Sequence, residues 1–299
     1  SEELKKFSDN MLKKLGGIST TAFQINQEIL KANVDLSTTF GRTQSAVQGL
    51  RKELVVALPE VSRLGGNFKD VINLQNNISK ELGTNRILLG ETTKDLFIAG
   101  KALGQADMGS VVGQFQDAGI QVGLIRDRME ETANIARVVG QNSSAVFTLV
   151  SSNLSKLNEY GFKDGVEGLS RMAAKASAMR FDMYQVFSFA EKVFSPEGAI
   201  EAVSAFQRLG VAVGDLADPF RLMYLASEDV EGLTDQIIQL TAKFSYFDEK
   251  SKEFKILPGS AKRDMRDLAA QMGITYDNLV KMSFAQQKLN MLSSQFKLD

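Results

Sequence analysis

The side chains available for chemistry in this sequence are restricted, because its 299 residues include no histidine and no cysteine. A zinc site of Cys and His, a thiol nucleophile, a disulfide and a Ser-His-Asp triad are therefore excluded. Carboxylates, lysine, serine, threonine and tyrosine remain. Any catalysis by this chain would rest on those groups.

Two clusters of carboxylates are the candidates for acid–base chemistry or for a Mg²⁺ site. They are Glu228-Asp229-Glu231 and Asp127-Glu130-Glu131. The first cluster falls at the start of a predicted helix, where acidic groups favour the helix dipole. In the second, Asp127 and Glu131 are four residues apart, a like-charge pair typical of a solvated helix face. We interpret both clusters as capping or surface groups.

Glycine-rich nucleotide-binding loops are also missing from the sequence. Neither GxxxxGK[ST] nor GxGxxG occurs. The glycines of "YGFKDGVEGL" have a different spacing and follow a predicted helix rather than a strand, so we expect turns there. We predict that the protein is not an enzyme, with no catalytic residue, no cofactor and no metal.

The composition favours an all-α fold. Hydrophobic residues make up 43% and charged residues 24%, as in ordinary globular proteins. Only four prolines interrupt the chain, which favours long helices. The net charge of -1 provides no general attraction for nucleic acid or an anionic membrane. No stretch reaches the roughly 18–20 apolar residues of a membrane span.

The N-terminal part carries a heptad pattern that predicts a coiled coil. Its apolar seam includes Ile18, Ala22, Ile25, Ile29, Leu36, Phe40, Val47, Leu50 and Leu54. One stutter of eleven residues separates Ile29 from Phe40. Amides, rather than Glu/Lys pairs, dominate the other faces. Such a surface suits packing against protein or lining a confined lumen, although drift in composition would also produce it.

A glycine-rich region follows the predicted coiled coil. Its members are Gly100, Gly104, Gly109, Gly113, Gly119 and Gly123, which form three consecutive GxxxG pairs. Such pairs let helices approach closely in membranes, but this segment is too polar to span one. We expect close helix packing or local breaks. Membrane contact in another state stays open.

The pattern divides the chain into two regions. We predict an elongated coiled-coil or helical-hairpin region over 1–120 and a compact domain of short helices over 121–299. Within the latter, Ser143 to Tyr160 and Asp215 to Ala226 are each expected to form one helix. The stretch 244–257 alternates apolar and polar residues about a charged turn, which predicts one small β-hairpin.

Helix corners of one type recur in the second region. The pattern is apolar, Gly or another residue, apolar, x, apolar, x, x, apolar. It occurs around Arg180, Gly210 and Gly273, with a looser copy at Gly119. The glycine can supply a left-handed C-cap, and the next apolar residue, such as Ile274, can fold back on the helix. The helices that follow are not basic, so we expect no sequence readout of nucleic acid.

These features together resemble a known family. A polar, low-proline coiled coil followed by Ala-, Gly- and Met-rich helices with the corners "LAAQMGITYDNLVKMS" and "AFQRLGVAVGDLAD" resembles tail tape-measure proteins of large phages, or a terminal portion of one. In that family, long helices lie inside the tail tube and set its length. The motifs carry no catalytic residue.

The resemblance implies a structural virion protein that acts in tail assembly, length determination and genome delivery. It implies a homo-oligomer, with a trimer or hexamer expected, and tail-tube or baseplate hub proteins as partners. The location would be the virion tail, in its lumen or at its baseplate end, after assembly in the host cytoplasm.

A second hypothesis is a soluble helical adaptor, or a baseplate or assembly protein, that binds a protein partner without catalysis. Its binding surface would be rich in methionine, with Met172, Met179, Met183 and Met223 as members. Methionine suits adaptable interfaces. The same residues can instead fill a core.

The coiled-coil hypothesis predicts the effect of two substitutions in the seam. We expect Leu36→Asp combined with Leu50→Asp to dissociate the oligomer, because charged groups cannot be buried there without partners. Sedimentation measures the change. Unchanged sedimentation would contradict the coiled coil.

Overall fold

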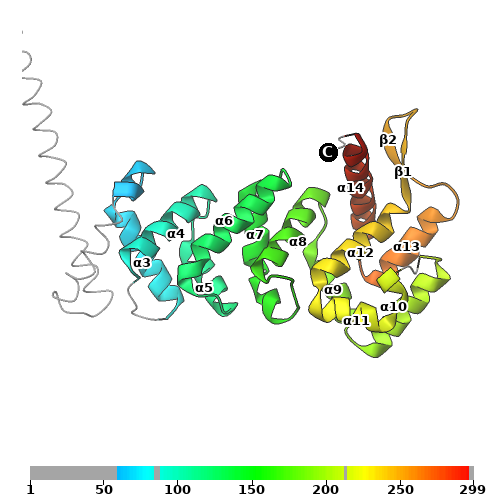
Figure 1. Ribbon diagram of the computed structural model, residues 1–299, viewed down its shortest axis with the longest axis horizontal. Coiled ribbons are helices and arrows are strands. Elements are labelled where there is room, and N and C mark those ends of the chain that lie inside the picture. The colour runs from blue at the N-terminus through cyan, green and yellow to red at the C-terminus, as the bar shows by residue number, and fades with distance from the viewer. Residues whose placement is uncertain (1–58, 84–87, 212–213, 296–299) are drawn as a thin grey trace, which may run out of the picture. The chain divides into compact units, whose positions relative to one another are not determined.

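A computed structural model describes residues 59–83, 88–211 and 214–295. These residues are mostly helical and include one two-stranded sheet, which confirms a predominantly helical fold with one small hairpin. The predicted coiled coil, with its seam from Ile18 to Leu54, lies outside the described residues. The chain divides into two compact units, residues 1–126 and 127–299, and the division falls within α6 (Val122–Val138) (Figure 1).

The described part of the first unit is built from short capped helices. They are α3 (Phe68–Glu81), α4 (Gly90–Ala102) and α5 (Met108–Asp117), followed by the first residues of α6. Asn67 and Asp70 form a reciprocal capping box at the start of α3, with N–O distances of 2.8 and 3.0 Å. Asp107 accepts a hydrogen bond from the Ser110 amide and caps α5.

The glycine-rich region is divided between close packing and local breaks. A Cβ atom at Gly109 would lie 2.9 Å from the carbonyl carbon of Asn77, and one at Gly113 would lie 2.6 Å from Cγ of Glu81. These two glycines therefore let α5 approach α3. Gly104 and Gly119 have φ angles of +64° and +80° and end α4 and α5.

The second unit contains the remaining elements. They are the rest of α6, α7 (Ser143–Ser152), η1 (Leu154–Asn158), α8 (Val166–Met179), α9 (Met183–Val193), α10 (Pro196–Arg208), η2 (Gly214–Ala217), α11 (Pro219–Glu228), α12 (Val230–Ala242), β1 (Ser245–Asp248), β2 (Glu253–Ile256), α13 (Ala261–Met272) and α14 (Tyr276–Gln295). The largest fully buried side chains in this unit include Phe147, Phe189 and Phe206. Helix α14 packs on both α8 and α12.

Two predicted helices are wrong in their bounds. Where one helix was expected from Ser143 to Tyr160, α7 ends at Ser152 and a 3₁₀ helix follows. Asn153 ends α7 because its side-chain amide donates to the Leu149 carbonyl at 2.8 Å.

The expected helix from Asp215 to Ala226 is also divided. Asp218 caps a new helix whose first residue is Pro219, where the missing N–H costs nothing.

The predicted corners have one hydrogen-bonding pattern. At Gly273 (φ +65°), the Ile274 amide donates to the Ala269 carbonyl at 3.1 Å. At Gly210 (φ +67°), the Val211 amide donates to the Phe206 carbonyl at 2.9 Å. This bond from the residue after a left-handed position to a carbonyl five residues earlier defines the Schellman motif.

The same closure recurs at the other predicted corners, Arg180 and Gly119, and at three further positions. Arg180 adopts the left-handed conformation without being glycine, and the Phe181 amide donates to the Ala176 carbonyl at 3.2 Å. Equivalent bonds close the corners at Gly65, Gly104, Gly119 and Gly140. Ile274, Val211 and Phe181 are buried, so the residue after the corners at Gly273, Gly210 and Arg180 joins the core.

The hairpin is an antiparallel pair beside α14 (Figure 1). Its register pairs Ser245 with Ile256 and Asp248 with Glu253. Phe254 contacts Phe247 across the strands and Phe284 of α14, with ring centroids 5.1 and 6.1 Å apart. A hydrogen bond from Lys255, with further bonds from the Lys250 amide and Ser251, lowers the pKa of Asp248 to about 2.

The contact of α5 with α3 predicts a graded response to alanine. We expect Gly109→Ala to destabilise the protein by about 1–3 kcal/mol, because its Cβ would meet the backbone of Asn77. Gly113→Ala should cost less, since it meets the flexible side chain of Glu81. Denaturant unfolding measures both.

Gly123→Ala is the matched control for this series. This exposed helical glycine has no atom within 4 Å of its added Cβ, so alanine should be neutral or stabilise by up to about 1 kcal/mol. Equal losses at Gly109 and Gly123 would contradict the packing argument.

Candidate functional site: a polar groove and a buried ion network

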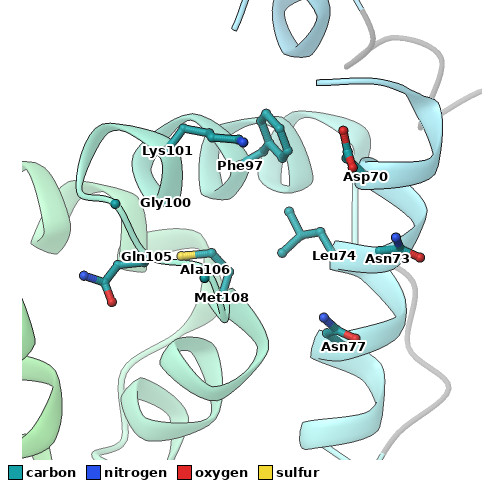
Figure 2. A pocket seen from close by; sticks show the side chains of 11 residues that line it. Asp70, Asn73, Leu74, Asn77, Phe97, Gly100, Lys101, Gln105, Ala106 and Met108 are labelled. Atoms are coloured by element: carbon teal, nitrogen blue, oxygen red, sulfur yellow. The ribbon is translucent and has the colours of Figure 1, made fainter. Parts of the chain in front are cut away.

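A groove of about 550 Å³ lies between α3, α4 and the start of α5 in the first unit. Figure 2 shows Leu74 projecting from α3 into this space, opposite Phe97 of α4 and Met108 of α5. Gly100 leaves room for Met108, because a Cβ there would lie 2.6 Å from its Cγ. The left-handed turn at Gly104 then directs the chain along the rim of the groove.

The polar groups of the groove are mostly neutral. Amides come from Asn73 and Asn77 of α3 and from Gln105 of the connecting turn. The carboxylate, Asp70, already accepts the Asn67 amide of the capping box. The ammonium group of Lys101 lies 5.6 Å from the centre of the Phe97 ring, a cation–π contact. The groove therefore offers hydrogen-bond donors and acceptors next to apolar side chains, which is binding chemistry.

The second unit contains a buried ion network between α8 and α12. Arg171 donates from Nε and Nη2 to the two carboxylate oxygens of Glu231, each at 2.9 Å. It also donates to Glu167 at 2.8 Å and to the Lys163 carbonyl at 3.0 Å. The hydrogen bond with Glu231 raises the pKa of Arg171 above its ordinary value.

Lys175 extends this network along α8. Its ammonium group contacts Glu231 at 3.3 Å and Asp235 at 2.7 Å. The Glu231 side chain is only 11% exposed, so its charge is largely removed from water and is balanced by two cations. The network holds two helices 60 residues apart in sequence, which is a structural task.

The two carboxylate clusters of the sequence have different surroundings. Asp229 accepts the Gly232 amide at 2.8 Å and caps α12, as the capping interpretation requires. Glu231 is buried rather than at the surface, so that part of the interpretation is wrong. Glu131 pairs with Arg128 on its own helix at 2.8 Å. In the part of the chain that the structure describes, no group of three or more acidic residues is arranged to hold a metal ion.

The structure does not bring the predicted site residues together at one site. The coiled-coil residues Ile18, Ala22, Ile25, Ile29, Leu36, Phe40, Val47, Leu50 and Leu54 all lie outside the described residues. Gly210, Gly273 and Ile274 form corners in the second unit and do not contribute to the groove. The groove was missed because its residues alternate between polar and apolar with no recognisable motif.

Three of the four methionines of the adaptor hypothesis fill the core, which was the alternative interpretation, and Met223 is half-buried. Met172, Met179 and Met183 are at most 5% exposed. The large apolar side chains that are exposed include both aliphatic and aromatic residues. Tyr184 of α9 is 69% exposed, and Phe220 at the start of α11 is 80% exposed.

Comparison with known proteins identifies no relative. No protein-family model, no curated protein and no solved structure matches this chain. Separately, no helix within residues 59–83, 88–211 and 214–295 is long and apolar enough to cross a membrane.

The ion network predicts a large cost for removing its central charge. We expect Glu231→Gln to destabilise the second unit by about 1–3 kcal/mol, because Arg171 and Lys175 would then be left near a neutral group while keeping their other carboxylate partners. Thermal or denaturant unfolding measures the loss.

Glu167→Gln is the matched control, since it removes one carboxylate from the same arginine at a more exposed position. Its cost should be about 0–1 kcal/mol. Comparable losses for the two variants would contradict the argument from burial.

Proposed function

We propose that this chain is a structural component of a phage tail, similar to a tape-measure protein or a terminal portion of one, and that it acts without catalysis. The observation that carries the proposal is the recurring helix corner. One hydrogen-bonded closure joins successive short helices at Gly104, Gly119, Gly140, Arg180 and Gly273. A chain built from such repeated joints extends by adding helices, as a structural assembly protein requires.

The polar interactions in the described residues support a mechanical role. The most buried charged side chain, Glu231, binds two cations that also belong to the scaffold. The buried hydroxyl of Ser283 on α14 likewise donates to the Thr241 carbonyl at 2.7 Å, close to the end of α12. Groups that reaction chemistry could use are thus engaged in joining helices.

In this proposal the predicted coiled coil assembles a homo-oligomer, a trimer or hexamer, about the tail axis. Tail-tube or baseplate hub proteins are its partners, and the tail of the virion is its location. Tail assembly and length determination would depend on helix length, with genome delivery as a further role. The groove between α3, α4 and α5 is a place where a polypeptide with both apolar and amide groups can bind.

An in-frame deletion tests the length-determining role. Removing 28 residues, four heptads, from the seam between Ile18 and Leu54 should shorten tails by roughly 42 Å, because a helix rises about 1.5 Å per residue. Electron microscopy of purified virions measures tail length, and mass spectrometry of the same virions shows whether the chain is present. The charge substitution Glu249→Lys, at an exposed turn, should leave length unchanged.

If the shortened chain is present in virions whose tails have unchanged length, the length-determining role is wrong and another tail or baseplate role is favoured. Absence from virions would favour the second candidate, an assembly adaptor. The exposure of Phe220 and Tyr184 supports that candidate, because large exposed aromatic side chains commonly serve as anchors at protein interfaces. A native product much heavier than 32.8 kDa would identify the chain as part of a longer protein.

A further inference from the structure

The hairpin has one outer edge that is partly covered and one that is open. In an antiparallel pair, main-chain groups point alternately into the pair and away from it. The Leu257 amide donates to the Phe244 carbonyl at 2.9 Å, and the register then places Tyr246 and Lys255 in the next bonded pair. The main-chain groups of Ser245 and Phe247 on β1, and of Phe254 and Ile256 on β2, therefore point away from the pair.

The edge of β1 is capped by α14 at Ser245, while the outward groups of Phe247 have no hydrogen-bond partner among the described residues. The side-chain amide of Gln287 donates to the Ser245 carbonyl at 3.0 Å and to the Ala242 carbonyl at 2.8 Å. Within the residues that the structure describes, no such partner reaches the outward groups of Phe254 and Ile256. An edge of this kind can pair with another strand.

The sequence of β2 is complementary to itself in one antiparallel register. If Phe254 stands opposite Phe254 of a second copy, Glu253 of each copy stands opposite Lys255 of the other. Opposite charges directly across strands stabilise a pair. In the same register, the outward N–H and C=O of Phe254 in one copy can bond to those of Phe254 in the other. The register that pairs the charges is therefore also one that forms main-chain hydrogen bonds.

The two faces of the hairpin also fit this register. Phe247 and Phe254 share the face that packs on Phe284, and pairing would extend the aromatic row across the two copies. On the other face, Lys255 bonds to Asp248 at 2.5 Å, and Glu253 is exposed. In the joined sheet, each Glu253 would lie between Asp248 of its own hairpin and Lys255 of the other copy. A two-stranded sheet gains more from such an extension than a large sheet does.

We propose that β2 pairs antiparallel with β2 of a second copy of this chain, centred on Phe254, to form a four-stranded sheet about a two-fold axis. The interface is isologous, so each contact occurs twice. The inference does not rest on the proposed tail function. It is also separate from the predicted coiled coil, because the residues that form it lie in the second unit.

Charge exchange tests the register. Glu253→Lys and Lys255→Glu should each weaken self-association roughly tenfold, because both cross-strand pairs become like-charged. Mixing the two variants should restore dimers, since each lysine then faces a glutamate. Sedimentation velocity over a concentration series measures association. Glu249→Lys makes the same charge change in the exposed turn and should leave association unchanged.

Cysteine pairing provides a second readout, because the natural chain has no cysteine. A mixture of Glu253→Cys and Lys255→Cys chains should form a covalent dimer under mild oxidation with diamide, since directly opposed residues have the Cβ separation that a disulfide needs. Either variant alone should cross-link poorly, because the cysteines of its two copies would lie diagonally across the paired strands and not directly opposite each other. The mixture of Glu249→Cys with Lys255→Cys is the control.

The results of these two experiments distinguish β2–β2 pairing from any other way in which two copies could associate. Restored association and a mixture-dependent cross-link establish the register. If the charge variants sediment like the natural chain and the Glu253→Cys and Lys255→Cys mixture cross-links no better than the control, the pairing is wrong. Circular dichroism of every variant should keep the helical signal of the natural chain. Because Lys255→Glu also loses the bond to Asp248 within its own hairpin, restored association in the mixture, and not the loss in that variant alone, tests the pairing.

Discussion

The fold depends above all on one short-range hydrogen bond, from the amide after a left-handed residue to a carbonyl five residues earlier. It ends a helix at a defined residue and turns the chain away from the helix axis. A polar N-cap then starts the next helix within a few residues. Asp107 follows Gly104, Asn142 follows Gly140, and each accepts an amide of the new helix. The direction of successive helices is therefore determined locally.

Local corners need support from contacts between distant residues, and two kinds are present. Gly161 lies so close to the junction of α11 and α12 that its amide donates to the Ser227 carbonyl at 2.6 Å, while its carbonyl accepts the Val230 amide. A side chain there would collide with the backbone of Glu228. The salt bridge of Arg171 with Glu231 joins α8 to the same helix. Both contacts fix α12, on which α14 and the hairpin depend.

The sequence predicted features that depend on neighbouring residues, and it did not predict features that depend on residues far apart in the chain. The corners at Gly210 and Gly273 and the hairpin were predictable, because a left-handed glycine, a following apolar residue and a charged turn are all read within a few positions. The burial of Glu231 was not, since its partner Arg171 is 60 residues away. The corner at Arg180 was predicted from its apolar pattern, but its left-handed conformation was not, because the residue type gives no warning. The groove likewise arises from packing of α3 on α5 and has no motif.

The association surfaces considered for this protein differ in how strongly each depends on particular side chains. A coiled-coil seam or an aromatic anchor such as Phe220 requires particular side chains, so it can be recognised from residue types and exposure. The open edge of β2 presents main-chain groups, which every residue except proline supplies in full. Its selectivity must then come from the side chains beside the edge. The opposite charges of Glu253 and Lys255 favour one register, while any shift by one residue would oppose a charged group to an apolar one. Two charged residues are thus enough to make an otherwise permissive edge selective for its own sequence.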